Sequence, residues 1–271
     1  MLSLSRVRRI TSRQNPLVAR YRAAARGDTT VMLLDGVHLV ADALAARLHI
    51  CDAAVAADAG ADRDVTALVN RLQDAQVDVA TATAPVMAAL SPVRSSSPIV
   101  ALADRPAASM AQLFAAPPPL IVLAIDVQDP GNLGAIVRVA EAGGASGVIV
   151  AGASADPFGW KALRGSMGSA LRLPVVVADT AAALTELRRR GCRIVATAPR
   201  EGTSVFDTDL RTSLAVVIGS EGSGLEPALL ASADERVTIP MQAPVESLNA
   251  AVTAALIVYE ATRQRGLTSQ V

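Results

Sequence analysis

The sequence predicts an α/β protein with two domains, the second of which is built on a mostly parallel sheet. The chain has 271 residues, of which 51% are hydrophobic, so it can bury substantial cores. Short apolar runs rich in β-branched residues alternate with helical patterns along both halves of the chain. Three consecutive prolines, Pro117 to Pro119, interrupt this alternation and indicate a boundary between the domains.

The first domain is predicted to span residues 1–105. Its segment SRQNPLVARYRAAARG is expected to form a helix from about Pro16 to Gly27, because proline favours the first helical turn and glycine the helix end. The expected elements after it alternate as strand, helix, strand, helix and strand, namely TTVMLLD, GVHLVADALAARL, HICDAAVAAD, ADRDVTALVNRLQDA and SSSPIVALAD. This order predicts a small α/β unit.

Residues 106–119, rich in proline and alanine, are predicted to be a linker, and residues 120–271 to form the second domain. Its expected strands are LIVLAID, SGVIVAG, LPVVVAD, CRIVATA, LAVVIGS and ERVTIPM. Such continuous apolar runs are typical of parallel strands covered on both faces. The last helix, NAAVTAALIVYEATRQR, is apolar on nearly all sides, so either the core or a second subunit is expected to cover it.

The charge distribution leaves two interpretations of the N-terminal region open. Basic and acidic residues number 25 each, so no net positive field attracts nucleic acid to the whole chain. The first thirty residues nevertheless carry a concentration of arginines. They form either a solvated helical face or a surface that binds phosphates.

The cysteine and histidine content predicts neither a disulfide framework nor a metal site. Cys51 and Cys192 are far apart in the chain, and His38 and His49 are expected to be structural because no cluster of ligand residues adjoins them in sequence. The N-terminus lacks the apolar core of a signal peptide, and no apolar run is long enough to span a bilayer. We therefore expect a cytoplasmic protein without a membrane segment.

Three segments of the second domain place polar side chains next to strand ends. In DVQDPGNLGAIVRVAEAGG a helix is predicted to begin near Asn132, whose side chain can cap it. Arg138 lies six residues further on, about 9 Å along the helix axis, and its long side chain can lean back towards that end. A helix N-terminus favours an anion, although a capped helix with a surface arginine explains the same pattern.

The other two segments follow the fifth and sixth expected strands of this domain. In VVIGSEGSGLEP three glycines surround Glu221, which indicates that the backbone approaches something closely there. In TIPMQAPVESLNAAV either Ser247 or Asn249 can cap the last helix. No G-x-G-x-x-G fingerprint is present, so a nicotinamide-dependent oxidoreductase is disfavoured.

Together these segments resemble the SpoU (TrmH-like) branch of the SPOUT methyltransferases. The matching patterns are D-P-x-N-x-G-A-I-x-R at 129–138, G-x-E-G-x-G-L at 219–225, and I-P-M followed by S-L-N at 239–249. The resemblance covers residues 120–265. The segments ITSRQNPLVARYRAA and VMLLDGVHLVADAL also look like the substrate-binding domain that often precedes this catalytic domain.

The resemblance implies transfer of a methyl group from S-adenosylmethionine to a ribose 2′-hydroxyl in RNA. Large-subunit ribosomal RNA is the expected substrate, with tRNA, or RNA binding during ribosome assembly without catalysis, as the alternatives. The resemblance also implies a deep C-terminal trefoil knot and a homodimer formed through the catalytic domain. The sequence departs from the family at Val139, Gly143 and Ala243, which removes no expected catalytic side chain.

The resemblance assigns roles to three sets of residues. The resemblance gives Arg138 a part in activating the ribose hydroxyl. Because a guanidinium rarely deprotonates, binding the adjacent phosphate and stabilising the developing alkoxide is the easier task for Arg138. The expected catalytic set is Asn132, Arg138, Glu221, Ser247 and Asn249. The expected cofactor-binding set is Thr197, Ile218, Gly219, Ile239, Met241 and Leu248. The expected RNA-binding set is Arg9, Arg13, Arg22, Lys161 and Arg164.

Overall fold

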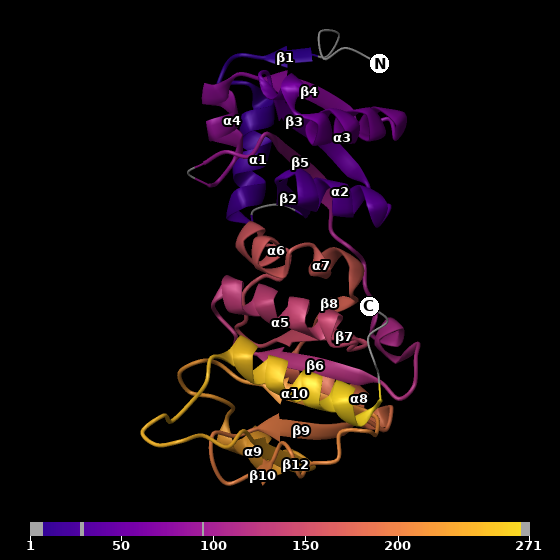
Figure 1. Cartoon of the computed structure of the whole chain (residues 1–271), viewed down its shortest axis with the longest axis vertical. Helices are drawn as coiled ribbons and strands as arrows, with labels where there is room; N and C mark the ends of the chain where they lie inside the picture. The colour runs from indigo at the N-terminus through magenta and orange to yellow at the C-terminus, as the bar shows by residue number, and fades with distance from the viewer. Residues whose placement is uncertain (1–7, 28–29, 94, 267–271) are drawn as a thin grey trace. The chain divides into compact units, whose positions relative to one another are not determined.

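The chain folds into two compact units, each with its own β-sheet (Figure 1). The computed structural model describes residues 8–27, 30–93 and 95–266. Within these ranges no helix combines the length and the apolar character needed to cross a membrane.

The division between the units differs from the predicted one at an inserted segment. The first unit comprises residues 1–107 together with residues 158–171, and the second comprises residues 108–157 together with residues 172–271. The inserted segment belongs to the first unit because Trp160 packs against that unit's hydrophobic core. The sequence prediction had placed this segment in the second domain.

Residues 108–119 of the predicted linker belong to the second unit and pack against it. They contain the 3-10 helix η3 (Met110–Phe114), which begins with a capping box between Ser109 and Gln112. Leu113 of this helix is fully buried in the core of the second unit. Residues 115–118 are exposed and lead towards the next strand, whereas Pro119 is buried, so only this short stretch behaves as connecting chain.

The first unit is built on a five-stranded mixed sheet in the order β1-β4-β3-β5-β2. The strand β4 pairs in parallel with β1 and β3, whereas β5 pairs antiparallel with β3 and β2. The three strands predicted in this domain are confirmed, and β1 and β4 are additional. The strands are β1 (Arg8–Ile10), β2 (Val31–Asp35), β3 (Ile50–Ala56), β4 (Asp78–Ala82) and β5 (Ile99–Asp104).

The first helix of this unit, α1 (Pro16–Arg26), is confirmed with both of its predicted ends. The Asn15 side chain accepts a hydrogen bond from the Leu17 N–H, and Gly27 ends the helix in the left-handed region at φ 83°. The remaining helices are α2 (Val37–Ala45), η2 (Ala59–Ala61), α3 (Arg63–Asp74), α4 (Ala84–Leu90), α6 (Trp160–Ser166) and α7 (Ser169–Arg172).

The second unit is built on a seven-stranded sheet in the order β10-β12-β9-β11-β6-β7-β8, and every pair of neighbouring strands is parallel. The six predicted strands are confirmed, and β10 is additional. The strands are β6 (Leu120–Ile125), β7 (Gly147–Ala151), β8 (Val175–Val177), β9 (Arg193–Thr197), β10 (Thr203–Ser204), β11 (Leu214–Ile218) and β12 (Glu235–Thr238). The trefoil knot stays a prediction.

Helices cover both faces of this sheet, which explains why its strands are apolar throughout. Leu113 and Leu187 pack with Ile121, Leu123 and Ile149 on one face. On the other face α5 and α10 lie against each other in front of the strands (Figure 1). The helices of this unit are α5 (Pro130–Ala142), α8 (Thr180–Arg189), α9 (Pro227–Ser232) and α10 (Ala250–Gln264).

Gly143, at the end of α5, allows α10 to approach closely. A Cβ atom built at this position would overlap Val258 Cγ1 and lie 3.3 Å from Val139 O. The Thr262 hydroxyl also donates a hydrogen bond of 2.6 Å to the Gly143 carbonyl oxygen. The absence of a side chain at Gly143 therefore sets the separation of the two helices.

We predict that Gly143→Ala destabilises the second unit by about 1–3 kcal/mol, because the added methyl group overpacks the α5–α10 contact. Chemical denaturation of purified protein measures this change. Gly222→Ala is the matched control, because a Cβ atom at Gly222 meets nothing within 4 Å. Equal unfolding midpoints for the two variants would contradict the conclusion that Gly143 sets the separation of α5 and α10.

Candidate functional site

A cavity of about 310 Å³ lies in the second unit. It is in the size range of small-molecule sites, which begins at about 300 Å³. Its lining comes from the segments that follow β9, β11 and β12 and from the start of α10. All six residues of the expected cofactor-binding set line it: Thr197, Ile218, Gly219, Ile239, Met241 and Leu248.

The parallel sheet explains why these segments meet. Parallel strands present their carboxyl ends at one edge, and loops that leave this edge form ligand sites in open α/β sheets. Here β9 ends at Thr197, β11 at Ile218 and β12 at Thr238. The Thr197 hydroxyl donates a 2.8 Å hydrogen bond to the Val217 carbonyl oxygen, which ties β9 to β11 next to the cavity.

The three glycines of the loop after β11 differ in whether their position would tolerate a side chain. A Cβ atom at Gly219 would lie 2.7 Å from the Gly224 carbonyl oxygen and 2.8 Å from the Leu225 nitrogen. Gly224 adopts a left-handed conformation at φ 66°, and it pairs with Ser220 through two backbone hydrogen bonds. A Cβ atom at Gly222 meets nothing within 4 Å. The close approach predicted at Gly219 is therefore made by the loop itself.

Three of the expected catalytic side chains form one chain of hydrogen bonds. Asn132 Nδ2 donates to Glu221 Oε1 at 2.7 Å. Asn249 Nδ2 donates to Asn132 Oδ1 at 3.0 Å. The first pair joins residues 89 positions apart in sequence and the second joins residues 117 positions apart. These contacts connect the starts of α5 and α10 to the loop after β11.

The direction of these hydrogen bonds is fixed at both ends. An ionised Glu221 can only accept, so it must face the amide nitrogen of Asn132, and Asn132 then presents its oxygen to Asn249. At the other end Asn249 Oδ1 accepts from the backbone N–H groups of Ala251 and Val252. Only one orientation of both amides satisfies all four hydrogen bonds.

The helix caps correct one sequence prediction and decide another. The helix α5 begins at Pro130, and its cap is Asp129, whose Oδ1 accepts from the Asn132 N–H at 2.7 Å. Asn132 therefore does not cap this helix, and its side chain is available to Glu221 and Asn249. Of the two candidates for capping α10, Asn249 is the cap, while Ser247 lines the cavity.

Arg138 does not join this group. It lies on α5 with an exposed side chain, and it is absent from the described residues that line the cavity. It makes no hydrogen bond or ion pair with any residue that the structure describes. Its guanidinium is therefore available for an external anion.

The expected RNA-binding residues near the N-terminus lie in the first unit. Arg9 in β1 and Arg22 in α1 are exposed, and Arg22 lines a shallow depression there. Arg13 Nε donates a hydrogen bond of 3.0 Å to the Pro85 carbonyl oxygen, so part of that guanidinium has a structural partner.

Lys161 and Arg164 lie on α6 rather than in the loop that the sequence predicted, and both are exposed. Trp160, at the start of this helix, packs against the core of the first unit. The Lys161 ammonium lies 5.5 Å from the centre of the Trp160 ring, within the range of a cation–π contact. The tryptophan is therefore a packed aromatic residue.

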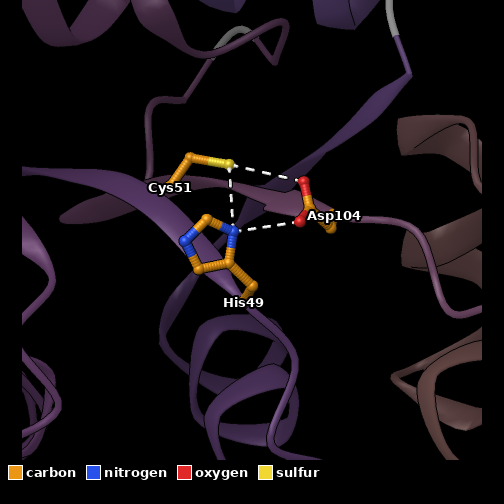
Figure 2. Close-up of side chains that lie close together, drawn as sticks. All are labelled: His49, Cys51 and Asp104. Atoms are coloured by element: carbon orange, nitrogen blue, oxygen red, sulfur yellow. Dashed lines mark hydrogen bonds and ion pairs between the residues drawn. The ribbon is translucent and has the colours of Figure 1, made fainter.

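The sequence analysis missed one cluster of ligand-type side chains. His49 was expected to have no suitable neighbours, but the strands β3 and β5 bring it together with Cys51 and Asp104 in the first unit (Figure 2). Cys51 is only two residues from His49, whereas Asp104 reaches the cluster through strand pairing. The spacing H-x-C was the only signal in the sequence.

The parallel sheet and the cavity at its carboxyl edge define an α/β protein with a small-molecule site. Residues 119–259 match the SpoU rRNA Methylase family. The chain is 33% identical over 271 residues to an uncharacterized tRNA/rRNA methyltransferase of Synechocystis sp.. The aligned region covers 96% of this chain and 95% of the relative. The chain therefore belongs to the SpoU rRNA methylase family, which is a family of methyltransferases.

Two further relatives bear on the site. The 23S rRNA (guanosine(2553)-2′-O)-methyltransferase RlmP of Bacillus subtilis is 40% identical over 139 residues, which cover 51% of this chain and 56% of RlmP. The crystal structure of an AdoMet-bound rRNA methyltransferase from Sinorhizobium meliloti matches with a TM-score of 0.86 at 27% identity. That match covers 97% of this chain and 99% of the other. It confirms the α/β fold with its parallel sheet as the SPOUT type.

We predict that Asn132→Asp destabilises the second unit at neutral pH, because two carboxylates then face each other where an amide faced Glu221. Lowering the pH should restore stability, since the folded pair binds a proton more tightly than the separated groups of the unfolded chain. Thermal unfolding measured at neutral pH and at successively lower pH tests both the destabilisation and its recovery. Glu221→Gln is the control, because a glutamine oxygen can accept the same hydrogen bond. An equal loss of stability in Glu221→Gln at neutral pH would contradict the explanation by two facing carboxylates.

Proposed function

We propose that this chain methylates a ribose 2′-hydroxyl of large-subunit ribosomal RNA with S-adenosylmethionine as the methyl donor. One observation carries the proposal: the cavity at the carboxyl edge of the sheet adjoins the chain of hydrogen bonds between Asn132, Glu221 and Asn249. The AdoMet-bound relative supports the donor, and RlmP supports the 2′-hydroxyl and the class of RNA.

The lining of the cavity fits this donor. Ile218, Ile239 and Leu248 supply apolar surface for an adenine ring. Ser220 and Ser247 supply hydroxyl groups, and the loop after β11 supplies backbone groups for polar parts of the ligand. When bound, S-adenosylmethionine supplies a methyl group activated by a positively charged sulfur.

Glu221 is suited to accept the proton of the ribose hydroxyl. It is the only ionisable side chain among the described residues that line the cavity. Its Oε1 accepts from Asn132, and its Oε2 makes no hydrogen bond with any residue in the described part of the chain. With the donor bound and supplying its methyl group to the 2′-oxygen, Glu221 Oε2 would accept the hydroxyl proton.

Arg138 is suited to position the substrate rather than to take the proton. A guanidinium keeps its charge at a pH up to about 12, so it is a poor base. Its five donors match the oxygens of a phosphate next to the reacting ribose, and its charge stabilises the developing alkoxide. The exposed basic side chains of the first unit, Arg9, Arg22, Lys161 and Arg164, add further contacts with the RNA backbone.

The second unit is proposed to form a homodimer through α10. Val252, Leu256 and Tyr259 are 47%, 43% and 53% exposed. Their spacing of four and three residues places them in one stripe along the helix. A second copy of the chain would cover this apolar stripe, which is otherwise costly to leave in water.

We predict that the wild-type enzyme methylates one ribose in large-subunit ribosomal RNA and that Glu221→Gln slows the transfer at least about 100-fold while keeping the fold. Arg138→Ala should slow it by about 100-fold or more and leave cofactor affinity unchanged. Ribose methylation mapped on purified ribosomal RNA, with calorimetry for the cofactor, measures both. Exposed Arg63→Ala is the control. Methylation of tRNA alone would refute the proposed substrate, and full activity of Glu221→Gln would refute the base.

We predict that Leu256→Glu converts the dimer into a monomer, because a buried carboxylate without a partner opposes association. Light scattering coupled to gel filtration measures the mass of wild type and variant. Thr185→Glu on α8 is the control for an added surface charge. A wild-type mass equal to that of one chain would contradict the dimer.

A further inference from the structure

Three side chains of different chemistry meet on the surface of the first unit, outside the proposed methyl-transfer site. His49 Nδ1 lies 2.9 Å from Asp104 Oδ2. Cys51 Sγ lies 3.7 Å from Asp104 Oδ1 and 4.0 Å from His49 Nδ1. Figure 2 shows the imidazole, the thiol and the carboxylate pointing toward one another.

The backbone holds these residues in place. Asp104 ends β5, and its N–H donates a hydrogen bond of 2.9 Å to the carbonyl oxygen of His49, the residue that precedes β3 by one position. The pairing of these strands shifts between Ile50 and Asp52, so Cys51 is the extra residue of a β-bulge. A bulge redirects a side chain that regular pairing would place elsewhere, and bulges are frequent next to functional sites.

We propose that His49, Cys51 and Asp104 bind a divalent transition-metal ion of the zinc class. The three ligand atoms lie within 4.8 Å of one another. Around a tetrahedral zinc ion, nitrogen and oxygen ligands lie about 3.4 Å apart, and sulfur lies about 3.6 Å from each of them. The separations of His49 Nδ1 from Asp104 Oδ2 and from Cys51 Sγ, 2.9 and 4.0 Å, differ from those values by about 0.5 Å or less. Cys51 Sγ lies 3.7 Å from the other carboxylate oxygen of Asp104, Oδ1.

The donor set selects the class of ion. An imidazole, a thiolate and a carboxylate together suit zinc and its neighbours, whereas calcium and magnesium take oxygen ligands. The His49 and Asp104 side chains are 72% and 58% exposed, so an ion can enter from solvent and keep a water molecule as a fourth ligand.

The charges around the cluster favour a cation. Asp104 is a direct member, and Asp52, the next residue after Cys51, is 3% exposed. Asp52 is paired with Arg20 at 2.9 Å, which offsets one of the two negative charges. Deprotonation of Cys51 on metal binding adds one more negative charge to the ion's ligands.

A titration of tag-free protein with cobalt(II) tests the site. Cobalt replaces zinc in such sites, and a thiolate ligand gives charge-transfer absorption in the near ultraviolet. Wild type should show this absorption and lose it when zinc is added. Cys51→Ser should abolish it, and His49→Ala and Asp104→Asn should each weaken cobalt binding at least about tenfold.

The chain provides a matched control for the histidine and another for the thiol. His38 is the only other histidine, and it is exposed on α2; Cys192 is the only other cysteine, and it is buried in the second unit. His38→Ala and Cys192→Ser should bind cobalt as wild type does. No charge-transfer band in wild type, or equal weakening by His38→Ala and His49→Ala, would overturn the proposal.

Thiol alkylation of the wild-type protein keeps the test independent of variant folding. Zinc should protect Cys51 from alkylation by at least about tenfold, as located by mass spectrometry of the digested protein. Unchanged alkylation of Cys51 at saturating zinc would overturn the proposal even if every variant folds poorly. Neither measurement uses methyl transfer, so the result is independent of the proposed function.

Discussion

The amide of Asn132 is the contact on which the candidate site depends. It accepts from Asn249 at the start of α10 and donates to Glu221 in the loop after β11. A primary amide can do both at once, because its nitrogen donates while its oxygen accepts. Glu221 can only accept, and Asn249 has its own oxygen committed to the helix cap. The hydrogen-bonding capacity of Glu221 and of Asn249 therefore determines the orientation of the Asn132 amide between them.

The packing of α5 against α10 brings this amide within reach. Asn132 lies in the first turn of α5 and Asn249 caps α10, so their distance is set by how closely the helices approach. Gly143 permits that approach at the far end of α5, where a side chain would meet Val258. Gly143 thus contributes to the position of the polar groups through helix packing, although it belongs to neither the cavity nor the hydrogen-bond chain.

The sequence predicted the strands of the second unit well, because long β-branched runs between helical patterns have few alternatives. It missed β1, β4 and β10, which are short or alanine-rich and are defined by their partners more than by their own residues. It missed the helix α4 for a similar reason. The motif residues around the cavity were found by resemblance, but the capping role predicted for Asn132 was wrong because Asp129 caps α5. Asp104 beside His49 could not be predicted, because a side chain 55 residues away arrives only through strand register.

The loop after β11 is held in place by contacts within the protein, whereas the Arg138 side chain is not. Gly219 and Gly224 let the loop after β11 close on its own backbone, and Glu221 in that loop is held by Asn132. This wall of the cavity therefore requires little ordering when a small ligand binds, which favours affinity. Arg138 has no such partner among the described residues, so ordering its side chain must be offset by the contacts it makes with a bound anion. The first turn of α5 is thus held by Asn132 in the hydrogen-bond chain, whereas Arg138, further along the same helix, presents an exposed side chain to solvent.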